Sequence, residues 1–231
     1  MESQHFVVLR RGDSRAIGEC RLAYSVDGVF EFCDPFGCRR ALLTEHDTVY
    51  ADLVPPLYRP QPLTSCIYLE FSDPVIIGAK TTTLWATAPY ELLIHVNDTA
   101  IAYVSPFKVK YTLVGDVIDG TVCRHHRSRA WLSLEEALRS AGIYALVRID
   151  VSGVEGIIPG IGFNAALTEL YIDDEGRLFY PILVARREPR HVAARLSSER
   201  PLAGVRRVWQ ASRKLRVPIT SPAFITPIPS P

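Results

Sequence analysis

The sequence has few side chains that are prone to heat damage. It contains two asparagines, three glutamines and one methionine among 231 residues, and most of its basic residues are arginine. Scarcity of these residues is typical of thermophilic proteins. A GC-rich genome would produce the same arginine bias without heat, so the composition favours a thermophilic source with a GC-rich genome as the alternative.

Long apolar segments are also missing. No run approaches the roughly 18 to 20 residues that span a membrane, and the start, MESQHFVVLRRGD, has no basic stretch followed by an apolar one. The apolar fraction of 48% and charged fraction of 22% are those of an ordinary globular chain. We therefore expect a cytoplasmic protein without a transmembrane segment.

Motifs that carry catalysis are absent as well. The chain has no GxSxG, HExxH or CxxC, and the glycines of VEGIIPGIGFNAAL match neither GxGxxG nor a phosphate-binding loop. Nothing nominates a nucleophile with its base. No cofactor is expected, and a non-catalytic role is favoured over an enzymatic one.

Most of the chain alternates apolar and polar residues, the two-residue period of a half-buried strand. The pattern recurs in segments such as RLAYSV, SCIYLEF, TTTLWATA and AGIYALVRIDV. A hairpin is expected in ELYIDDEGRLFYPILV, where Gly176 can adopt the positive φ of a tight turn. The sequence predicts an all-β protein of antiparallel, sandwich-like sheets, forming one large sandwich or two small ones.

One segment departs from this pattern. In WLSLEEALRSAG, Ser133 is followed three residues later by Glu136, as in a capping box, and the segment ends at Gly142. This pattern predicts one short helix. The tail VPITSPAFITPIPSP is rich in proline and is expected to be extended. We expect an all-β body at residues 1–185 and a basic C-terminal region at residues 186–231.

Two cysteines flank a predicted turn. In EFCDPFGCRRALL, Asp34-Pro35-Phe36-Gly37 matches a type I turn, so Cys33 and Cys38 should face each other across a hairpin. Facing strand residues can bring their Cα atoms within the roughly 4.4 to 6.8 Å of a disulfide. Free thiols, a disulfide and a shared metal ion all remain open.

The richest chemical cluster is CRHHRSR. Adjacent residues of a strand point to opposite faces, so Cys123 and His125 would share a face while His126 points away. No metal site is assigned, and Cys123, His125 and His126 are weak candidates for one. An exposed basic loop is the simpler interpretation.

Basic residues concentrate near the C-terminus. Residues 186–216 have ten basic residues against two acidic ones, whereas the remainder of the chain has 16 against 23. Such a region could dock an acidic protein or a nucleic acid, or it could pair with the acidic body of its own chain. The anion-binding candidates are Arg186, Arg187, Arg190, Arg206, Arg207, Arg213, Lys214 and Arg216.

A resemblance spans residues 50–127. It is carried by a Pro-rich crossing, VPPLYRPQPL, the step Pro89-Tyr90-Glu91, and TLVGDVIDGTVCR, where Val114 stands in place of an aromatic residue. These features resemble an uncharacterised archaeal family, the domain of unknown function 432. The resemblance implies an archaeal source and a cytosolic β-protein, and it brings no activity, cofactor or catalytic residue.

These observations favour a non-catalytic binding or assembly module, with its partner unknown. One alternative is a metal-binding protein or enzyme that uses Cys123, His125 and His126. Another is a carbohydrate-binding β-sandwich, because tryptophan rings can stack on sugars. The chain has three tryptophans, Trp85, Trp131 and Trp209.

Overall fold

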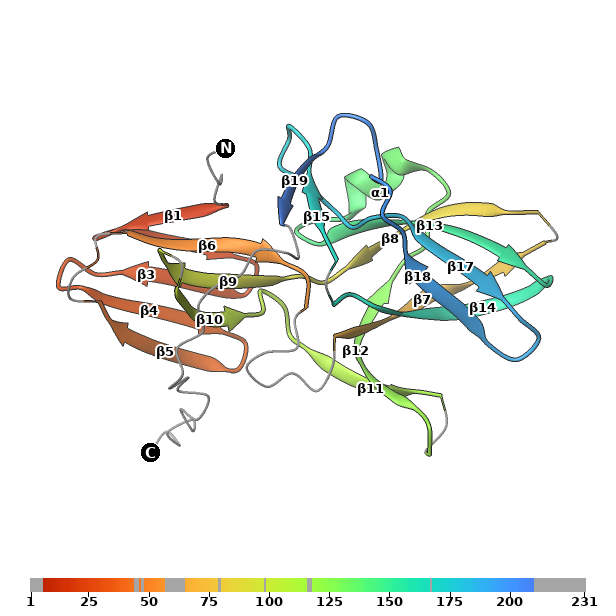
Figure 1. The fold of residues 1–231 in the computed structure, drawn as a ribbon, viewed down its shortest axis with the longest axis horizontal. Helices are drawn as coiled ribbons and strands as arrows, with labels where there is room; N and C mark the ends of the chain where they lie inside the picture. Colours follow the sequence, from red (N-terminus) through yellow and green to blue (C-terminus); the bar gives the residue numbers. More distant parts are fainter. Residues whose placement is uncertain are drawn as a thin grey trace.

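The computed structural model describes residues 6–43, 46, 48–56, 65–78, 80–97, 99–115, 118–166 and 168–209. Four β-sheets pack in pairs, and the ribbon separates into two lobes along its longest axis (Figure 1). The predicted all-β class is therefore confirmed, in its form with two small sandwiches.

The first sandwich consists of sheets A and B, both antiparallel. Sheet A has the order β1-β6-β9-β10, and sheet B the order β2-β3-β4-β5. The strands of sheet A are β1 (Val7–Arg10), β6 (Thr48–Val54), β9 (Glu91–Val96) and β10 (Thr99–Val104). The strands of sheet B are β2 (Ser14–Ile17), β3 (Cys20–Tyr24), β4 (Val29–Asp34) and β5 (Gly37–Leu42).

The second sandwich consists of sheets C and D. Sheet C has the order β11-β12-β7-β14, and sheet D runs β18-β17-β13-β16-β15-β19 with β8 also paired to β13. Sheet C contains β7 (Cys66–Ile77), β11 (Lys110–Val114), β12 (Thr121–Ser128) and β14 (Gly156–Asn164). Sheet D contains β8 (Thr82–Ala88), β13 (Ala145–Gly153), β15 (Leu170–Ile172), β16 (Leu178–Phe179), β17 (Leu183–Arg187), β18 (Val192–Leu196) and β19 (Arg206–Trp209).

The sheets are mostly antiparallel, with exceptions where strands are joined by long connections. β12 runs parallel to β7, and β13 runs parallel to β16 and β17. Parallel neighbours require such crossovers. Between β7 and β12 the chain leaves the second sandwich, forms β9 and β10 in the first, and returns.

Among the described strands the chain passes from the first lobe to the second after β6, returns after β8 and passes to the second again after β10. The described strands of the first sandwich therefore come from two separate pieces of sequence. The boundary expected between residues 185 and 186 falls inside β17, and β18 continues the same sheet. Residues 210–231, which include the Pro-rich tail, lie outside the described part of the chain.

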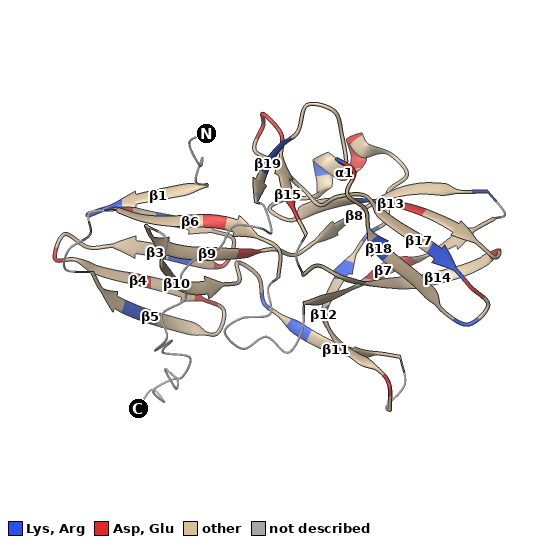
Figure 2. Ribbon diagram, viewed as in Figure 1, with Lys and Arg blue, Asp and Glu red and all other residues tan. Residues whose placement is uncertain are grey.

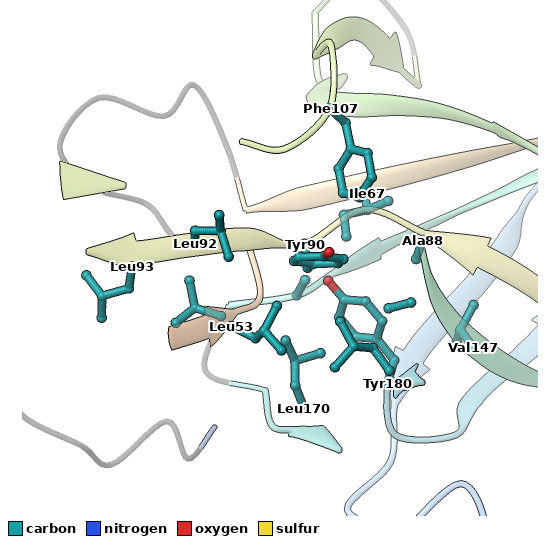
Figure 3. Close-up of a cluster of buried hydrophobic side chains, with 14 of the residues drawn as sticks. Leu53, Ile67, Ala88, Tyr90, Leu92, Leu93, Phe107, Val147, Leu170 and Tyr180 are labelled. Atoms are coloured by element: carbon teal, nitrogen blue, oxygen red, sulfur yellow. The ribbon is translucent and has the colours of Figure 1, made fainter. Parts of the chain in front are cut away.

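The hydrophobic core is continuous across the junction between the lobes. One cluster of buried side chains extends from Leu9 in β1 to Ala185 in β17. Figure 3 shows its middle, where Leu53 and Leu92 of the first sandwich lie near Tyr180 of the second. The Tyr180 hydroxyl donates a hydrogen bond to the Pro89 carbonyl oxygen at 2.6 Å, beside the β8–β9 crossing. Burial of these apolar groups stabilises the contact between the two sandwiches.

Local expectations can be compared with the structure. The predicted hairpin is confirmed as β15 and β16, with Gly176 at φ 83°, although Pro181 ends β16 after two residues. The predicted helix is confirmed as α1 (Leu134–Ser140). Ser133 lies at its N-cap but makes no side-chain capping hydrogen bond, so the capping box does not form. No helix of the described residues is long and apolar enough to cross a membrane.

Candidate ligand-binding site between the two sandwiches

Strand β12 carries polar side chains into the junction between the lobes. Its alternation places Arg124, His126 and Ser128 on one face and Cys123 and His125 on the other. Arg124 is 7% exposed and Ser128 is 3% exposed. The interpretation of this segment as an exposed basic loop is therefore wrong, because the segment belongs to β12, a central strand between β11 and β7.

Arg124 is held by a carboxylate from the crossing strand β9. Its guanidinium forms an ion pair with Glu91, whose side chain is also buried. The Nε atom of Arg124 has no hydrogen-bond partner among the described residues. A cavity of about 30 Å³ is lined by Arg124, and this volume is enough for a water molecule that would accept a hydrogen bond from Nε.

His126 belongs to a short hydrogen-bonded chain next to this ion pair. Its Nε2 lies 2.9 Å from Thr87 Oγ1, which lies 3.0 Å from Ser128 Oγ. Burial, with a smaller contribution from the charge of His125, lowers the pKa of His126 to about 4. The imidazole is therefore neutral at pH 7. Thr87 is 6% exposed, so this arrangement orders the interior and does not present a nucleophile to a substrate.

The three weak metal candidates are separated by the fold. Cys123 forms a disulfide with Cys66 of β7, with the Cα atoms 4.6 Å apart. His125 Nε2 lies 2.5 Å from Glu70 Oε2, while His126 points to the opposite face. A disulfide sulfur is not the thiolate that binds metal. No group of three or more metal-ligating side chains gathers in the described part of the chain.

A larger cleft lies where the sandwiches meet. Its volume is about 390 Å³, and its walls come from the β2–β3 turn, the end of α1 and the β15–β16 hairpin. The residues that line it are mostly apolar: Phe6, Ala16, Ile17, Gly18, Tyr90, Leu138, Ala141, Gly142, Ile143, Tyr144, Leu146, Glu175, Gly176, Arg177 and Leu178. Side chains of both lobes thus contribute to one hollow.

An aromatic stack separates the cleft from the small cavity at Arg124. Tyr144 lines both hollows, and its ring stacks on Phe107 with centroids 4.3 Å apart. Tyr90 meets Phe107 edge to face at 5.1 Å, and His126 lies 4.6 Å from the Tyr144 ring. These contacts fix the floor of the cleft. Burial raises the pKa values of Tyr90 and Tyr144 above the ordinary tyrosine value, so both hydroxyls remain protonated at neutral pH.

Gly18 sets how closely the lobes approach at this point. It has φ +59°, and a Cβ here would lie 2.5 Å from the Pro106 carbonyl oxygen and 2.6 Å from Ile143 Cδ1. The neighbouring amide of Glu19 donates a hydrogen bond to Pro106 O at 3.0 Å. The β2–β3 turn therefore rests on the β10–β11 connection and on Ile143 of the second sandwich, and it lines part of the cleft.

Charge at the rim of the cleft is paired. Arg177 Nε lies 2.6 Å from Asp173 Oδ2, and its NH1 lies 2.7 Å from Glu175 Oε2. Two carboxylates surround one guanidinium, so this part of the rim is slightly negative. The cleft therefore combines apolar side chains with hydrogen-bonding groups, as small-molecule sites do.

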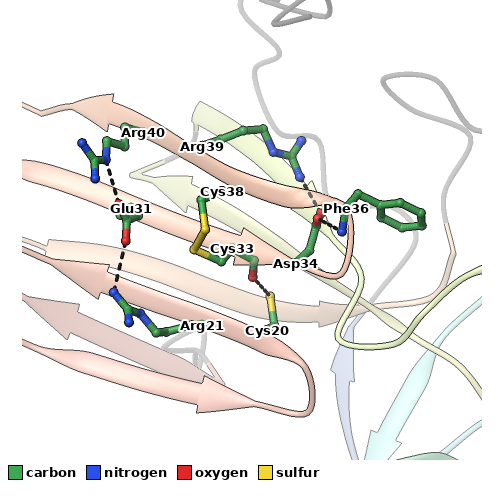
Figure 4. The surroundings of a disulfide bond; sticks show 9 residues. All are labelled: Cys20, Arg21, Glu31, Cys33, Asp34, Phe36, Cys38, Arg39 and Arg40. Atoms are coloured by element: carbon green, nitrogen blue, oxygen red, sulfur yellow. Dashed lines mark hydrogen bonds and ion pairs between the residues drawn. A yellow bond between two sulfur atoms is a disulfide. The ribbon is translucent and has the colours of Figure 1, made fainter. Parts of the chain in front are cut away.

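Cys33 and Cys38 form a second disulfide, between the paired strands β4 and β5 of sheet B. Their Cα atoms are 4.0 Å apart, closer than the range expected from the sequence. Figure 4 shows the bond beside the Asp34–Gly37 turn, where the Phe36 amide donates to Asp34 Oδ1 at 2.9 Å. Cys20 is a free, buried cysteine, and burial raises the pKa of its thiol to about 12. Its Sγ donates to the Cys33 carbonyl oxygen.

The basic residues of the C-terminal region lie on two separate edges of sheet D. Arg186 and Arg187 lie on β17 near one edge, while Arg206 and Arg207 lie on β19 at the other (Figure 2). Arg190 follows β17 in the turn to β18. The remaining candidates fall outside the described residues: Arg213, Lys214 and Arg216.

Two of these arginines are occupied within the chain. Arg187 donates to the Val154 and Glu155 carbonyl oxygens at 3.2 and 3.0 Å, which closes the β13–β14 turn. Arg207 pairs with Glu169 at 3.0 Å. Arg186, Arg190 and Arg206 form no ion pair with any described residue and are exposed.

The tryptophans of the carbohydrate alternative are largely internal. Trp85 is 5% exposed and Trp131 is 8% exposed, and their backbones pair with each other beside α1. Neither ring offers a face to a sugar. The side chain of Trp209 lies outside the described part of the chain.

Sequence reasoning missed the groups that build this junction. Glu91 and Arg124 are 33 positions apart, and nothing in their local patterns signals that they pair. The Cys66–Cys123 bond spans 57 positions and was equally hidden. Pro89-Tyr90-Glu91, noticed only as part of a resemblance, marks the crossing that carries both Tyr90 and Glu91 into the site.

Comparisons with known proteins give a family and no function. A family model described as a protein of unknown function (DUF432) matches residues 4–223. No curated protein and no solved structure matches the chain.

Proposed function

The chain belongs to the DUF432 family, and we propose that it is a non-catalytic binding protein that holds a small ligand in the cleft between its sandwiches. The observation that carries the proposal is the cleft itself. Its volume of about 390 Å³ lies in the range of small-molecule sites, and its walls come from both lobes. A ligand there would contact both sandwiches at once.

The residues that line the cleft favour ligand binding over catalysis. The residues that line the cleft include no His, Cys, Ser or Thr, and Glu175 is already paired with Arg177. A nucleophile and a base within hydrogen-bonding distance are the minimum for covalent catalysis. The cleft therefore offers shape and apolar contact, with the Tyr90 and Tyr144 rings as its aromatic surface.

Filling the cleft tests the proposal. Ligand-observed NMR with a library of neutral aromatic fragments should detect binders to the natural chain, and Ile143→Trp should abolish their binding. Ile76→Trp is the matched control, because Ile76 is 75% exposed on β7 and does not line the cleft. The proposal fails if no fragment binds, or if both variants lose binding equally while their dichroism spectra remain native.

The chain's arginines add a second part to the proposal, an acidic protein or a nucleic acid as partner. Its support is that Arg186, Arg190 and Arg206 are exposed and form no ion pair with described residues. Binding to nucleic acid should fall steeply with salt, because neutralised phosphates release counterions. Changing these three arginines to alanine should remove binding, and unchanged binding would refute this part.

A thermophilic, cytoplasmic setting belongs to the same proposal. Disulfides are rare in cytosolic proteins except in hyperthermophiles, and the described residues contain two. The scarcity of asparagine, glutamine and methionine points the same way. Calorimetry should give a melting temperature above about 90 °C, whereas about 45 to 65 °C would indicate a mesophilic protein.

A further inference from the structure

Strand β11 is the last described strand of sheet C on one side. It pairs with β12 through five consecutive residue pairs without a register shift, and no described strand pairs with its other edge. In Figure 1 the β11–β12 hairpin lies at the margin of the second lobe, with β11 outermost. The outward backbone groups of such a strand are a ready template for another strand.

Apolar side chains are exposed on this hairpin. Tyr111 is 44% exposed, Leu113 is 46% exposed and Val122 is 38% exposed. Tyr111 pairs with Arg124 and Leu113 with Val122, so all three apolar residues share the face on which Arg124 is buried. The face that buries Arg124 in the second sandwich thus continues into the β11–β12 hairpin, where its apolar side chains are partly exposed.

Other edge strands carry features that discourage pairing, and β11 carries little of this kind. β5 has Arg39 and Arg40, and β18 has Arg195. β14 contains Pro159 and a shift of register. Charges, prolines and bulges of this sort block edge-to-edge contact. In β11 the only charged residue is Lys110, at its first position.

We propose that β11 is a self-association edge, where a second copy of this chain adds its own β11 in antiparallel register. Centring the pair on Thr112 matches all five residues of each strand. Tyr111 of each copy then lies opposite Leu113 of the other, and each Lys110 lies opposite Val114. The two lysines are therefore at opposite ends, and the apolar residues meet, which makes the strand complementary to itself.

Site-specific cross-linking tests the register in the full chain. A mixture of Tyr111→Cys and Leu113→Cys proteins should form a covalent dimer under mild oxidation much faster than either protein alone, because only the mixture places the two thiols opposite each other. These positions lie on the face opposite Cys123, which limits exchange with the native disulfide. Equal rates in all three samples, or no dimer, would overturn the proposed pairing.

A charge substitution tests the interface by a separate route. Sedimentation equilibrium should show dimers of the natural chain, and Leu113→Lys should raise the dissociation constant by at least about tenfold through lost apolar burial and added repulsion. Val184→Lys is the matched control, since Val184 is 41% exposed on β17 and should leave the dissociation constant unchanged. A natural chain that stays monomeric at millimolar concentration, or equal effects of both variants, would refute self-association at β11.

Discussion

The two disulfides should differ in how much they stabilise the protein. Cys66 and Cys123 are 57 positions apart, whereas Cys33 and Cys38 are 5 apart. A cross-link stabilises mainly by restricting the unfolded chain, and the effect grows with the logarithm of the enclosed loop. This relation gives about 4 kcal/mol for the long loop and about 2 kcal/mol for the short one at 25 °C.

Paired substitutions measure this difference. Urea unfolding should show that Cys66→Ala with Cys123→Ala lowers the free energy of unfolding by about 4 kcal/mol or more, because Cys123 is also fully buried. Cys33→Ala with Cys38→Ala should lower it by about 2 kcal/mol. The comparison requires that both bonds are formed, so thiol titration of the unfolded, unreduced natural chain should find Cys20 alone.

Which disulfide pair costs more unfolding free energy when removed tests whether loop entropy dominates. If the short-loop pair costs as much as the long-loop pair, loop entropy does not dominate here, and local packing around Cys33 would have to supply the difference. If removing either pair leaves the free energy of unfolding unchanged, the hydrophobic core across the junction stabilises the fold without help from the disulfides. A protein with all four cysteines replaced should lose nearly the sum of the two decreases in unfolding free energy, since the two bonds lie in different sandwiches.

Two further predictions concern buried and strained positions. His126 is neutral when folded, with a pKa of about 4 against 6.5 for an ordinary histidine, so the unfolded chain takes up the proton first. The neutral, buried imidazole therefore adds about 3 kcal/mol at most to the free energy of unfolding, fully present above pH 6.5 and lost as the pH falls towards 4. Urea titrations at several pH values should show a weaker pH dependence of the unfolding free energy in His126→Gln than in the natural chain. Gly153→Ala should destabilise by more than about 2 kcal/mol, because a Cβ there would lie 2.2 Å from the Arg187 carbonyl oxygen at φ +116°. Gly176→Ala, at φ +83° with open space around it, should lose only about 1 kcal/mol in thermal unfolding, and equal losses would contradict the steric argument.

The sequence identified features that depend on neighbouring residues. The Asp34–Gly37 turn, the hairpin at Gly176 and the α1 helix each follow from signals within a few positions. Pairings between distant segments could not be read in the same way. Glu91 gives no sign of its partner Arg124. The run of arginines after residue 185 looks like one basic surface, although β17 lies next to the edge strand β18 on one side of sheet D and β19 is the edge strand on the other.

The division into lobes was hidden for the same reason. β9 and β10 have the alternation of ordinary strands, and nothing in them indicates that they join β1 and β6 in preference to the adjacent β8. The sequence hints at crossings in two places, the Pro-rich segment VPPLYRPQPL between β6 and β7 and the Pro89-Tyr90-Glu91 step between β8 and β9. The cleft was equally inaccessible to sequence analysis, because its walls come from segments that meet only after both sandwiches have formed.

The interleaved path of the chain constrains how it can fold during synthesis. Sheet A needs β9 as a central strand, so the first sandwich cannot close until residue 96 has left the ribosome. By then β7 and β8 have already emerged, and their partners β12, β13 and β14 are still to be made. The long apolar strand β7 must therefore wait unpaired while the first sandwich assembles around it, which exposes the nascent chain to aggregation and makes late, slow completion of the second sandwich its natural folding order.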